Sequence, residues 1–301
     1  MTDPIRHALV LAAGLGTRLR PLTDVRAKPA IPVAGEPIVR RIIAWLAEHG
    51  VTEVVLNLHH RPETLTAVVG DGADLSVRVR YSWEPRILGS AGGPRQALPI
   101  VGADPLLVVN GDTLTDVDLA GLTEAHAGSG AAVTLALVPN QEFERYGGVL
   151  LDADGRVTGF VRRGPSAAGS YHYVGVQLAH AAAFDAVRPG EPASSIGGAY
   201  DTLIAARPGS VRGFVSDAAF WDVGTTDDYW RTSRAFAARA STADLGVGRR
   251  ARIDPTSRIT RSILWDDVRI GAEAVIEDCI VTDGVSVAAG AVHRHEILIR
   301  S

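Results

Sequence analysis

The chain has 301 residues, 46% of them hydrophobic, which allows one large domain or two modest ones with a sizeable buried core. A formal net charge of −4 argues against a nucleic-acid binder with a basic face, and a single cysteine excludes an intrachain disulfide framework. No run reaches the ~18 apolar residues of a membrane span, and residues 1–16 do not read as a secretion signal, so we expect a cytoplasmic protein without membrane or nucleic-acid partners.

The first part of the chain alternates between short apolar runs and helical patterns. Residues 7–13 and 51–58 are apolar runs typical of buried parallel strands, and 37–50 has helical spacing between a proline and a glycine. The next expected elements are a helix near 61–70, a strand at 75–83, a helix from 92 and a strand at 105–112. This order predicts an α/β unit whose ligands bind at the carboxyl ends of strands. Gly14 and Asp112 both stand at such ends.

From about residue 131 the pattern becomes richer in strands. A run at 131–139 precedes a hairpin expected around Asp154–Gly155, and a further strand is expected at 171–179. A helix then begins near 225, with Thr225 or Thr226 as its N-terminal cap.

The last part of the chain repeats with a period of 17 residues. Branched aliphatic residues recur at matching places: Ile270 with Val287, Val275 with Val292, Ile280 with Ile297, Val281 with Leu298, and, one period earlier, Ile253, Ile259 and Ile263. The spacing predicts a short β-helix of about three coils, in which Cys279 is a small buried hydrophobe; an irregular β-tail is the alternative. We therefore expect domains at 1–244 and 245–301.

The segment AGLGTRLRP follows the first expected strand. Its spacing fits neither the P-loop nor the dinucleotide-binding pattern, and a simple tight turn would account for Gly14 and Gly16 alone. However, small residues let a phosphate or a base approach the backbone, and free N–H groups there can cradle an anion. Arg18 adds a bidentate phosphate donor and Lys28 a compact charge. Lys28 is the only lysine among the 30 Lys and Arg residues.

Two aspartates stand where apolar segments end. Asp112 follows VVNG and Asp222 follows FW, and a carboxylate in such a place is costly unless it is exposed or paired with a cation. Magnesium bound by one or two carboxylates and substrate phosphates is a usual arrangement, so we predict that both hold Mg²⁺. The alternative is that each caps a turn or helix, and we expect Asp116, Asp118 and Asp228 to be solvated turn or cap residues.

Together these motifs resemble the sugar-1-phosphate nucleotidylyltransferases over nearly the whole chain. The segments that carry the resemblance are GLGTRLRPLT, KPAIPV, LGSAGGP, VNGDT, RYGG and WDVGT. The resemblance implies a Rossmann-like, GT-A-like mixed α/β sheet followed by a short left-handed β-helix. LNLHH and LGSAGG are most similar to the mannose-1-phosphate guanylyltransferase and N-acetylmuramate-1-phosphate uridylyltransferase branches.

The resemblance implies that a nucleoside triphosphate and a sugar-1-phosphate give a nucleotide-sugar and pyrophosphate, with Mg²⁺ as cofactor. GTP with mannose-1-phosphate or a related hexose- or heptose-1-phosphate fits best; a uridylyltransferase on another sugar-1-phosphate is the alternative. The implied catalytic residues are Arg18, Lys28 and Asp112, and the implied metal ligands are Asp112 and Asp222. The implied nucleotide-binding residues are Leu11, Ala12, Ala13, Gly14, Gly16, Thr17, Gly89, Ser90 and Gly92. The implied sugar-phosphate-binding residues are Tyr146, Gly147, Arg162, Arg163, Tyr173 and Gly175.

The sugar-binding part departs from the family pattern. Arg162 and Arg163 stand where the family often has glutamate and lysine. Arg163 can still bind a phosphate, but Arg162 cannot accept hydrogen bonds from sugar hydroxyls. Tyr173 stands where the family often has asparagine. The sequence leaves the base, the sugar and a homodimer open.

Two other functions fit part of the pattern. A catalytically inactive subunit that binds nucleotide-sugar would be expected to lack one of Arg18, Lys28, Asp112 and Asp222, and all four are present. A glycosyltransferase that consumes nucleotide-sugars would be expected to carry an Asp-x-Asp metal motif, which NGDTLTD matches poorly. It would also leave GTRLRP unexplained. We therefore favour the nucleotidyltransferase.

Overall fold

The computed structural model describes residues 5–240 and 245–300. The chain forms two compact units: the first holds the described residues up to 14, 42–60 and 69–220, and the second holds 15–41, 61–68 and those from 221 on. The predicted domain boundary at 244/245 falls on residues 241–244, outside the described residues, and stays a prediction.

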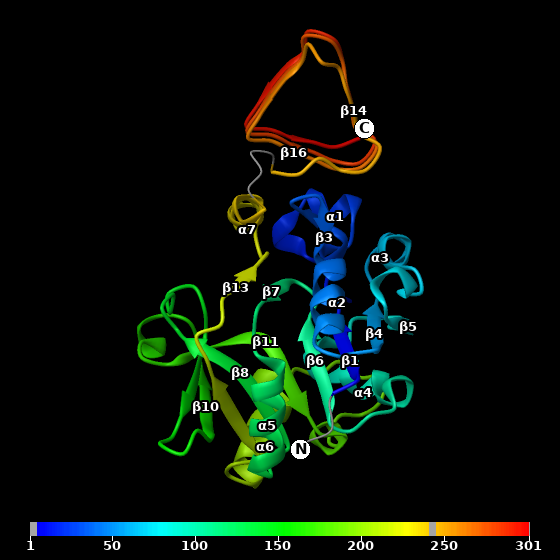
Figure 1. The fold of residues 1–301 in the computed structure, drawn as a ribbon. Helices are drawn as coiled ribbons and strands as arrows, with labels where there is room; N and C mark the ends of the chain where they lie inside the picture. The colour runs from blue at the N-terminus through cyan, green and yellow to red at the C-terminus, as the bar shows by residue number, and fades with distance from the viewer. Residues whose placement is uncertain (1–4, 241–244, 301) are drawn as a thin grey trace. The chain divides into compact units, whose positions relative to one another are not determined.

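The first unit is built on a mixed nine-stranded sheet (Figure 1). Four strands run parallel in the order β6-β1-β4-β5, and β11 joins β6 in the antiparallel sense. The strands are β1 (His7–Leu11), β4 (Glu53–Leu58), β5 (Arg78–Trp83), β6 (Leu106–Asn110), β8 (Val133–Pro139), β9 (Gly148–Leu151), β10 (Val157–Val161), β11 (Tyr171–Ala179) and β12 (Val211–Val215). The predicted apolar runs therefore become buried strands, and the hairpin around Gly155 joins β9 to β10. β7 (Thr113–Thr115) is a short strand outside this sheet.

Helices lie where the sequence predicted them, near 37–50, near 61–70 and from about 92. They are α2 (Ile38–Glu48), α3 (Pro62–Val69) and α4 (Gly89–Val101), whereas α5 (Leu119–Ser129) and α6 (Tyr200–Ala206) were not predicted. α4 begins three residues before the predicted start at 92. Asp118 is the N-cap of α5, where its side chain accepts a hydrogen bond from the Ala120 N–H, so the predicted capping role is confirmed.

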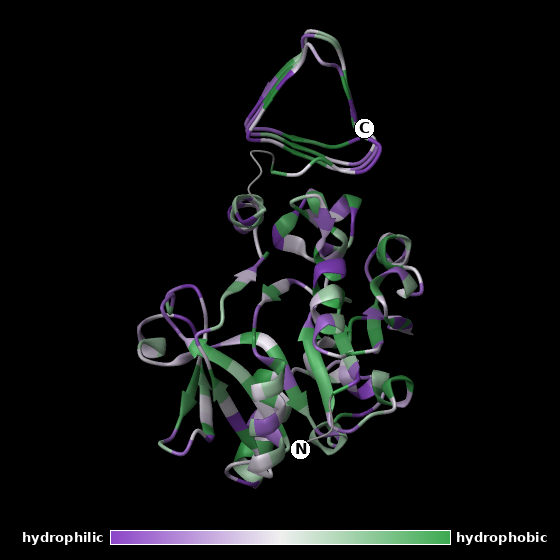
Figure 2. Ribbon diagram, viewed as in Figure 1, coloured by the Kyte–Doolittle hydropathy of each residue, from purple (hydrophilic) through white to green (hydrophobic). Residues whose placement is uncertain are grey.

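Two apolar clusters of the first unit lie on the face of the sheet that α4 covers. One cluster joins Leu9, Val55 and Val108 from adjacent parallel strands to the inner face of α4. A second joins strand β8 to Phe184 and Tyr200. Figure 2 shows the central strands as mostly hydrophobic ribbons. Strands buried on both faces need such continuous apolar runs, which is why the sequence pattern located them.

The second unit begins at Leu15, with the rest of the glycine loop and the segment that contains Lys28. This part forms short elements only: η1 (Thr17–Leu19), α1 (Leu22–Val25), η2 (Lys28–Ala30) and the paired strands β2 (Pro32–Val33) and β3 (Glu36–Pro37). Later in the chain come α7 (Thr226–Arg239) and, before it, the last two residues of β13 (Phe220–Asp222), whose first residue belongs to the first unit. Thr225 is the N-cap of α7, as predicted, and Asp228 completes a capping box. Asp228 is a cap, but it is buried rather than solvated.

The end of the second unit is a β-helix of three coils with a triangular cross-section (Figure 1). Three parallel three-stranded sheets form its sides: β14 (Arg252–Ile253), β17 (Arg269–Ile270) and β20 (Ser286–Val287); β15 (Arg258–Thr260), β18 (Val275–Glu277) and β21 (Val292–Arg294); β16 (Ile263–Leu264), β19 (Ile280–Val281) and β22 (Ile297–Leu298). The period of 17 is confirmed, because Ile270 pairs with Val287 and Ile280 with Ile297. Cys279 is fully buried in its apolar interior, as expected.

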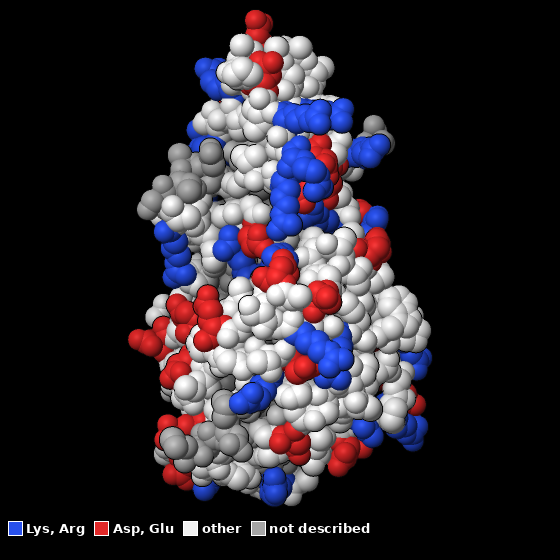
Figure 3. Space-filling model, turned by 45° about the vertical axis from the view of Figure 1, so that its right-hand side comes forward, with Lys and Arg blue, Asp and Glu red and all other residues white. Residues whose placement is uncertain are grey.

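The structure carries neither a membrane-spanning helix among its described residues nor charge of one sign alone on the face drawn in Figure 3. Across the described residues, no helix combines the length and the apolar character needed to cross a membrane. On the face drawn in Figure 3, basic residues lie interspersed with acidic ones.

Candidate active site

The glycine loop begins where β1 ends, in the first unit. The backbone N–H of Ala12 donates to Oδ1 of Asn57 over 2.5 Å. Gly14 is exposed, and a Cβ added there would meet no atom within 4 Å. The Leu11 carbonyl accepts from the Gly111 N–H, which follows strand β6. The predicted nucleotide residues Leu11 to Gly14 therefore lie at the carboxyl end of the parallel strands, with open space at Gly14.

The rest of the loop packs onto Lys28 in the second unit. Gly16 has a φ of 60°, and a Cβ there would come 2.7 Å from Cγ2 of Thr23 and 3.2 Å from Cβ of Lys28. Glycine is therefore required for the turn and for this close packing. Thr17 and Arg18 are exposed, whereas Lys28 is only 7% exposed. The structure thus brings Gly16 and Lys28 together.

Arg18 and Asp222 converge on Gly224 in the second unit. A Cβ on Gly224 would lie 3.0 Å from Oδ2 of Asp222 and 3.3 Å from Nη1 of Arg18. The segment is held by the capping box of α7, in which Asp228 Oδ2 accepts from the Thr225 N–H over 2.9 Å. A predicted phosphate donor and a predicted metal ligand therefore share one neighbourhood.

Asp112 lies in the first unit, so its predicted pairing with Asp222 stays a prediction. It follows β6, is half-buried, and lies 3.4 Å from the Thr113 hydroxyl that donates to it. A Cβ on Gly175 would come 2.9 Å from the side chain of Asn110, two residues before Asp112. Gly175 therefore faces the end of β6, close to where Asp112 follows in the chain.

A buried pair that the sequence analysis missed supports two predicted nucleotide segments. Glu84 is 0% exposed and Asn57 is 3% exposed. Asn57 donates from Nδ2 to Glu84 Oε1 over 2.7 Å, and Glu84 Oε2 accepts from the Leu88 N–H over 2.9 Å. The only sequence signal is a polar residue within each apolar pattern, at LNL and SWEP.

The predicted nucleotide residues of LGSAGGP pack against residues 191–195. The Ala193 carbonyl accepts from the N–H groups of Ala91 and Gly92. A Cβ on Gly89 would come 2.7 Å from that carbonyl oxygen. Ser90 Oγ accepts from the Ser195 N–H over 2.9 Å. Close packing within the protein is thus one reason for the glycines here; contact with nucleotide stays a prediction.

Gly147 and Arg163, two predicted sugar-phosphate residues, lie together. A Cβ on Gly147 would come 2.9 Å from the Val161 carbonyl oxygen and 3.8 Å from the Arg163 nitrogen. Asn140 Nδ2 lies 3.4 Å from the Gly147 carbonyl oxygen to which it donates. Arg162 and Arg163 are both exposed. Two guanidinium groups therefore stand at this edge of the first unit.

Tyr146 belongs to an aromatic cluster that the sequence did not indicate. Its ring lies 4.2 Å from the ring of His172, which lies 4.7 Å from the ring of Phe220. Burial, assisted by the charge of Arg145, lowers the pKa of His172 to about 4, although a backbone hydrogen bond at Gly147 opposes the shift. His172 is therefore a neutral, stacked side chain beside Tyr146 at neutral pH.

Tyr173 packs on the apolar core of the first unit together with Ala193 and Tyr200. Burial, with Tyr200 nearby, raises the pKa of its hydroxyl well above the usual value. The structure places it among apolar side chains, and its predicted contact with the sugar stays a prediction.

Comparison with known families decides the class of protein. A family model described as "Nucleotidyl transferase" matches residues 7–239. The chain belongs to the nucleotidyl transferase family. A second model, "GlmU-like, C-terminal hexapeptide", matches residues 240–294. The expected mixed α/β nucleotidyltransferase fold is confirmed, and the hexapeptide match together with the three parallel sheets agrees with the expected left-handed β-helix.

Relatives of this nucleotidyltransferase confirm the resemblance to sugar-1-phosphate enzymes. Mannose-1-phosphate guanylyltransferase of Mycobacterium tuberculosis is 31% identical over 90% of this chain and 82% of its own length. D-glycero-alpha-D-manno-heptose 1-phosphate guanylyltransferase of Aneurinibacillus thermoaerophilus is 32% identical over 76% of this chain and 97% of its own. The solved structure of HddC from Yersinia pseudotuberculosis complexed with GMP-PN superposes with a TM-score of 0.66 at 24% identity, covering 77% of this chain and all of that chain, and shows the shared fold.

Proposed function

We propose that this nucleotidyltransferase joins the nucleotidyl group of GTP to mannose-1-phosphate or a related hexose- or heptose-1-phosphate and releases pyrophosphate. The Mycobacterium and Aneurinibacillus relatives, which are named as guanylyltransferases of such sugars, support this substrate pair. The observation that carries the chemistry is the convergence of Arg18 and Asp222 at Gly224.

In this proposal the protein's side chains position the two substrates and neutralise the charge of their phosphates. The sugar phosphate oxygen attacks the α-phosphorus in line, and the bond to pyrophosphate breaks, so no covalent enzyme intermediate is needed. Arg18, which is exposed beside Gly224, would stabilise the charge of the departing pyrophosphate. Lys28 would approach the α-phosphate or the sugar phosphate, and Arg163 would bind the sugar phosphate.

Magnesium is the cofactor that we propose, with Asp112 and Asp222 as its protein ligands. Both are half-buried carboxylates at the ends of apolar strands, and carboxylate oxygen suits this cation. Within residues 5–240 and 245–300, no group of three or more acidic, histidine or cysteine side chains gathers to hold a metal. The remaining ligands would therefore be phosphate oxygens and water. When bound, the cation neutralises developing charge on the phosphates.

A uridylyltransferase is the second candidate. N-acetylmuramate alpha-1-phosphate uridylyltransferase of Neisseria meningitidis is 46% identical to this chain, although over 37% of the chain and 48% of its own length. That higher identity in a shorter region favours UTP and an acidic amino sugar. Two exposed arginines, Arg162 and Arg163, also suit an acidic sugar.

Pyrophosphate release from each nucleoside triphosphate, tested against a panel of sugar-1-phosphates with Mg²⁺, decides between these substrates. We expect the greatest kcat/KM for GTP with mannose- or heptose-1-phosphate. Greatest activity with UTP and N-acetylmuramate-1-phosphate would establish the second candidate, and no release with any pair would contradict both.

The metal role is tested by Asp112→Asn. We expect turnover to fall at least about a hundredfold with an unchanged unfolding midpoint, because the substitution removes a charged ligand but keeps the shape. Asp217→Asn, which changes an exposed acid of the same unit, is the matched control. Retained activity in Asp112→Asn would remove this residue from the metal site.

A further inference from the structure

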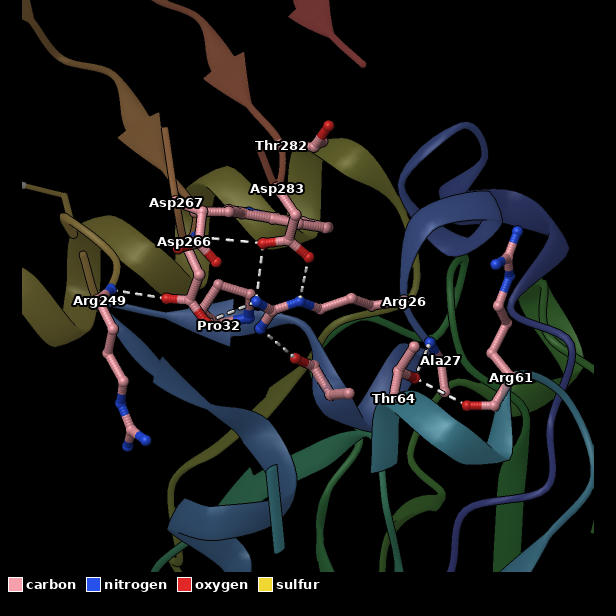
Figure 4. Close-up of polar contacts among 12 residues, drawn as sticks. Arg26, Ala27, Pro32, Arg61, Thr64, Arg249, Asp266, Asp267, Thr282 and Asp283 are labelled. Carbon is pink, nitrogen blue, oxygen red and sulfur yellow. Dashed lines mark hydrogen bonds and ion pairs between the residues drawn. The ribbon is translucent and has the colours of Figure 1, made fainter. Parts of the chain in front are cut away.

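Arg26 is a buried arginine two residues before Lys28. It is 7% exposed, and its guanidinium points between two aspartates of the β-helix (Figure 4). Nε donates to Asp283 Oδ2 over 2.6 Å, and Nη2 donates to Asp283 Oδ1 over 2.7 Å. Nη2 also donates to Asp266 Oδ2 over 2.7 Å. The bidentate geometry is the strongest that an arginine and a carboxylate can form.

The two aspartates occupy equivalent places in consecutive coils. Their numbers differ by 17, the period of the repeat. Asp266 N–H donates to Asp283 Oδ1 over 3.1 Å, and Arg249 N–H donates to Asp266 Oδ1 over 2.6 Å (Figure 4). Backbone N–H groups of the coils therefore hold both carboxylates in place, in addition to Arg26. The stack presents a fixed anionic site to one guanidinium.

The same arginine also touches the turn that carries the lysine. This turn, η2 (Lys28–Ala30), is called the lysine turn below. Nη1 of Arg26 donates to the Ala30 carbonyl over 3.2 Å. The Ala27 N–H, which precedes the lysine turn, donates to Thr64 Oγ1 over 3.0 Å (Figure 4). The guanidinium therefore joins the β-helix to the carbonyl at the end of the lysine turn.

A second chain of hydrogen bonds holds the segment after the lysine turn. The indole N–H of Trp265 donates to the hydroxyl of Tyr229 over 3.0 Å, and that hydroxyl donates to the Pro32 carbonyl over 2.6 Å. The centre of the Trp265 ring also lies 5.4 Å from Cζ of Arg26. The coil residues 265 and 266 thus reach the chain on both sides of the lysine turn.

We propose that Arg26 is a positioning residue through which Asp266 and Asp283 of the β-helix hold Lys28 in its reactive place. This proposal rests on the proposed function, because it matters for turnover only if Lys28 contacts a reacting phosphate. Asp283→Asn would leave the buried Arg26 with Asp266 alone of the two carboxylates, and Arg26→Gln would leave two half-buried carboxylates without their guanidinium, so the turn would shift rather than keep its place. The β-helix is then part of the catalytic apparatus and not only a stabilising cap.

Turnover is measured first in the full chain. We expect Arg26→Gln and Asp283→Asn each to lower kcat about tenfold or more, with KM for the triphosphate changed less than about threefold. The double variant should be no slower than either single one, because both remove the same contact. Asp266→Asn leaves the bidentate pair with Asp283 intact, so it should lower kcat less. It provides the test if Arg26→Gln and Asp283→Asn fold poorly. Arg26→Lys should recover part of the loss.

The matched control is an ion pair of the same coils that does not touch the lysine turn. Arg250 donates to both oxygens of Asp267, each over 2.7 Å, on the surface. Arg250→Gln and Asp267→Asn should change kcat less than about twofold, since exposed pairs contribute little. The proposal would be overturned if kcat fell equally in the Arg26 and Asp283 variants and in the Arg250 and Asp267 controls. Additive losses of kcat in the Arg26→Gln, Asp283→Asn double variant would also overturn it.

A second readout does not depend on activity. Because Lys28 is the only lysine, amine labelling followed by peptide mass spectrometry reports on this side chain, apart from the N-terminal amine. We expect Lys28 to be labelled about tenfold faster in Arg26→Gln and Asp283→Asn than in wild type, and at the wild-type rate in the Arg250 and Asp267 variants. An unchanged labelling rate would overturn the positioning role.

Lys28→Arg separates the two proposals. If this variant keeps normal turnover while labelling in Arg26→Gln is faster, the catalytic role of Lys28 fails and the structural coupling stands. If Lys28→Arg is inactive while Arg26→Gln is normal in both readouts, the coupling fails and the proposed function stands.

Discussion

The side-chain amide of Asn57 donates a hydrogen bond to the buried carboxylate of Glu84, with 2.7 Å between Nδ2 and Oε1. Oδ1 of Asn57 accepts a hydrogen bond from the Ala12 N–H, and Oε2 of Glu84 accepts one from the Leu88 N–H. One pair of side chains therefore ties the end of β1 to the start of α4. These are two of the places to which the sequence assigns nucleotide binding, so the pair sets their relative position within the first unit.

Glu84→Gln should destabilise the protein and weaken nucleotide binding. The new amide NH₂ faces either the Leu88 N–H or Asn57 Nδ2, so two donors meet and one stays unsatisfied, which costs roughly 1–3 kcal/mol. Urea unfolding and KM for the triphosphate measure the two effects. Glu124→Gln, an exposed acid on α5, is the control. Wild-type stability of Glu84→Gln would mean that the pair is not needed for folding.

Gly16→Ala and Gly14→Ala should differ sharply. Alanine at 16 meets Thr23 at 2.7 Å and needs a left-handed conformation that costs roughly 1–2 kcal/mol, so both the free energy of unfolding and kcat should fall. Alanine at 14 meets nothing within 4 Å, so unfolding should be unchanged, while KM for the triphosphate should rise if nucleotide rests there. An unchanged KM in Gly14→Ala would contradict the predicted nucleotide contact.

Stability should fall in mild acid because of His126. Burial, with the charge of His180 nearby, lowers the pKa of His126 to about 4, from an ordinary value near 6.5 in the unfolded chain. Between these values the unfolded chain binds a proton that the folded state excludes. Above about pH 6.5 protonation of His126 therefore does not change the free energy of unfolding. At pH 5 it lowers the free energy of unfolding by about 2 kcal/mol.

Urea unfolding at pH 7.5 and pH 5 checks this dependence. His126→Gln should flatten it in part, and the remaining slope belongs to His172, whose pKa burial also lowers to about 4. His49→Gln, which changes an exposed histidine in the turn after α2, is the control. A steep slope that persists in a variant lacking both His126 and His172 would contradict this account.

Arg163→Ala should raise KM for the sugar-1-phosphate more than KM for the triphosphate. Arg163 stands beside Gly147, and loss of one charged hydrogen-bond donor to phosphate costs roughly 1.5–3 kcal/mol, or about tenfold to a hundredfold in KM. Arg162→Ala, a change of the adjacent exposed arginine, is the comparison. If Arg162→Ala has the larger effect, the predicted assignment of the phosphate to Arg163 is wrong.

The order of strands and helices followed from the sequence because burial leaves a local record. β1 and β6 lie in continuous apolar runs, with Gly14 and Asp112 a few residues beyond the strands, and the coils of the β-helix repeat their branched residues every 17 positions. The segments GTRLRP and KPAIPV carried the family for the same reason, since their chemistry is contained in a few adjacent residues. Local patterns of this kind need no knowledge of distant partners.

The sequence by itself therefore determined the mixed sheet, the β-helix, the nucleotidyltransferase class and a set of candidate residues. The tertiary structure alone decided which polar residues meet: Arg26 with Asp283, Asn57 with Glu84, and Tyr146 with His172. In the first of these pairs the partners lie 257 positions apart. No periodicity records such a contact, because it depends on where folding brings two surfaces together and on the high cost of leaving a buried charge unpaired.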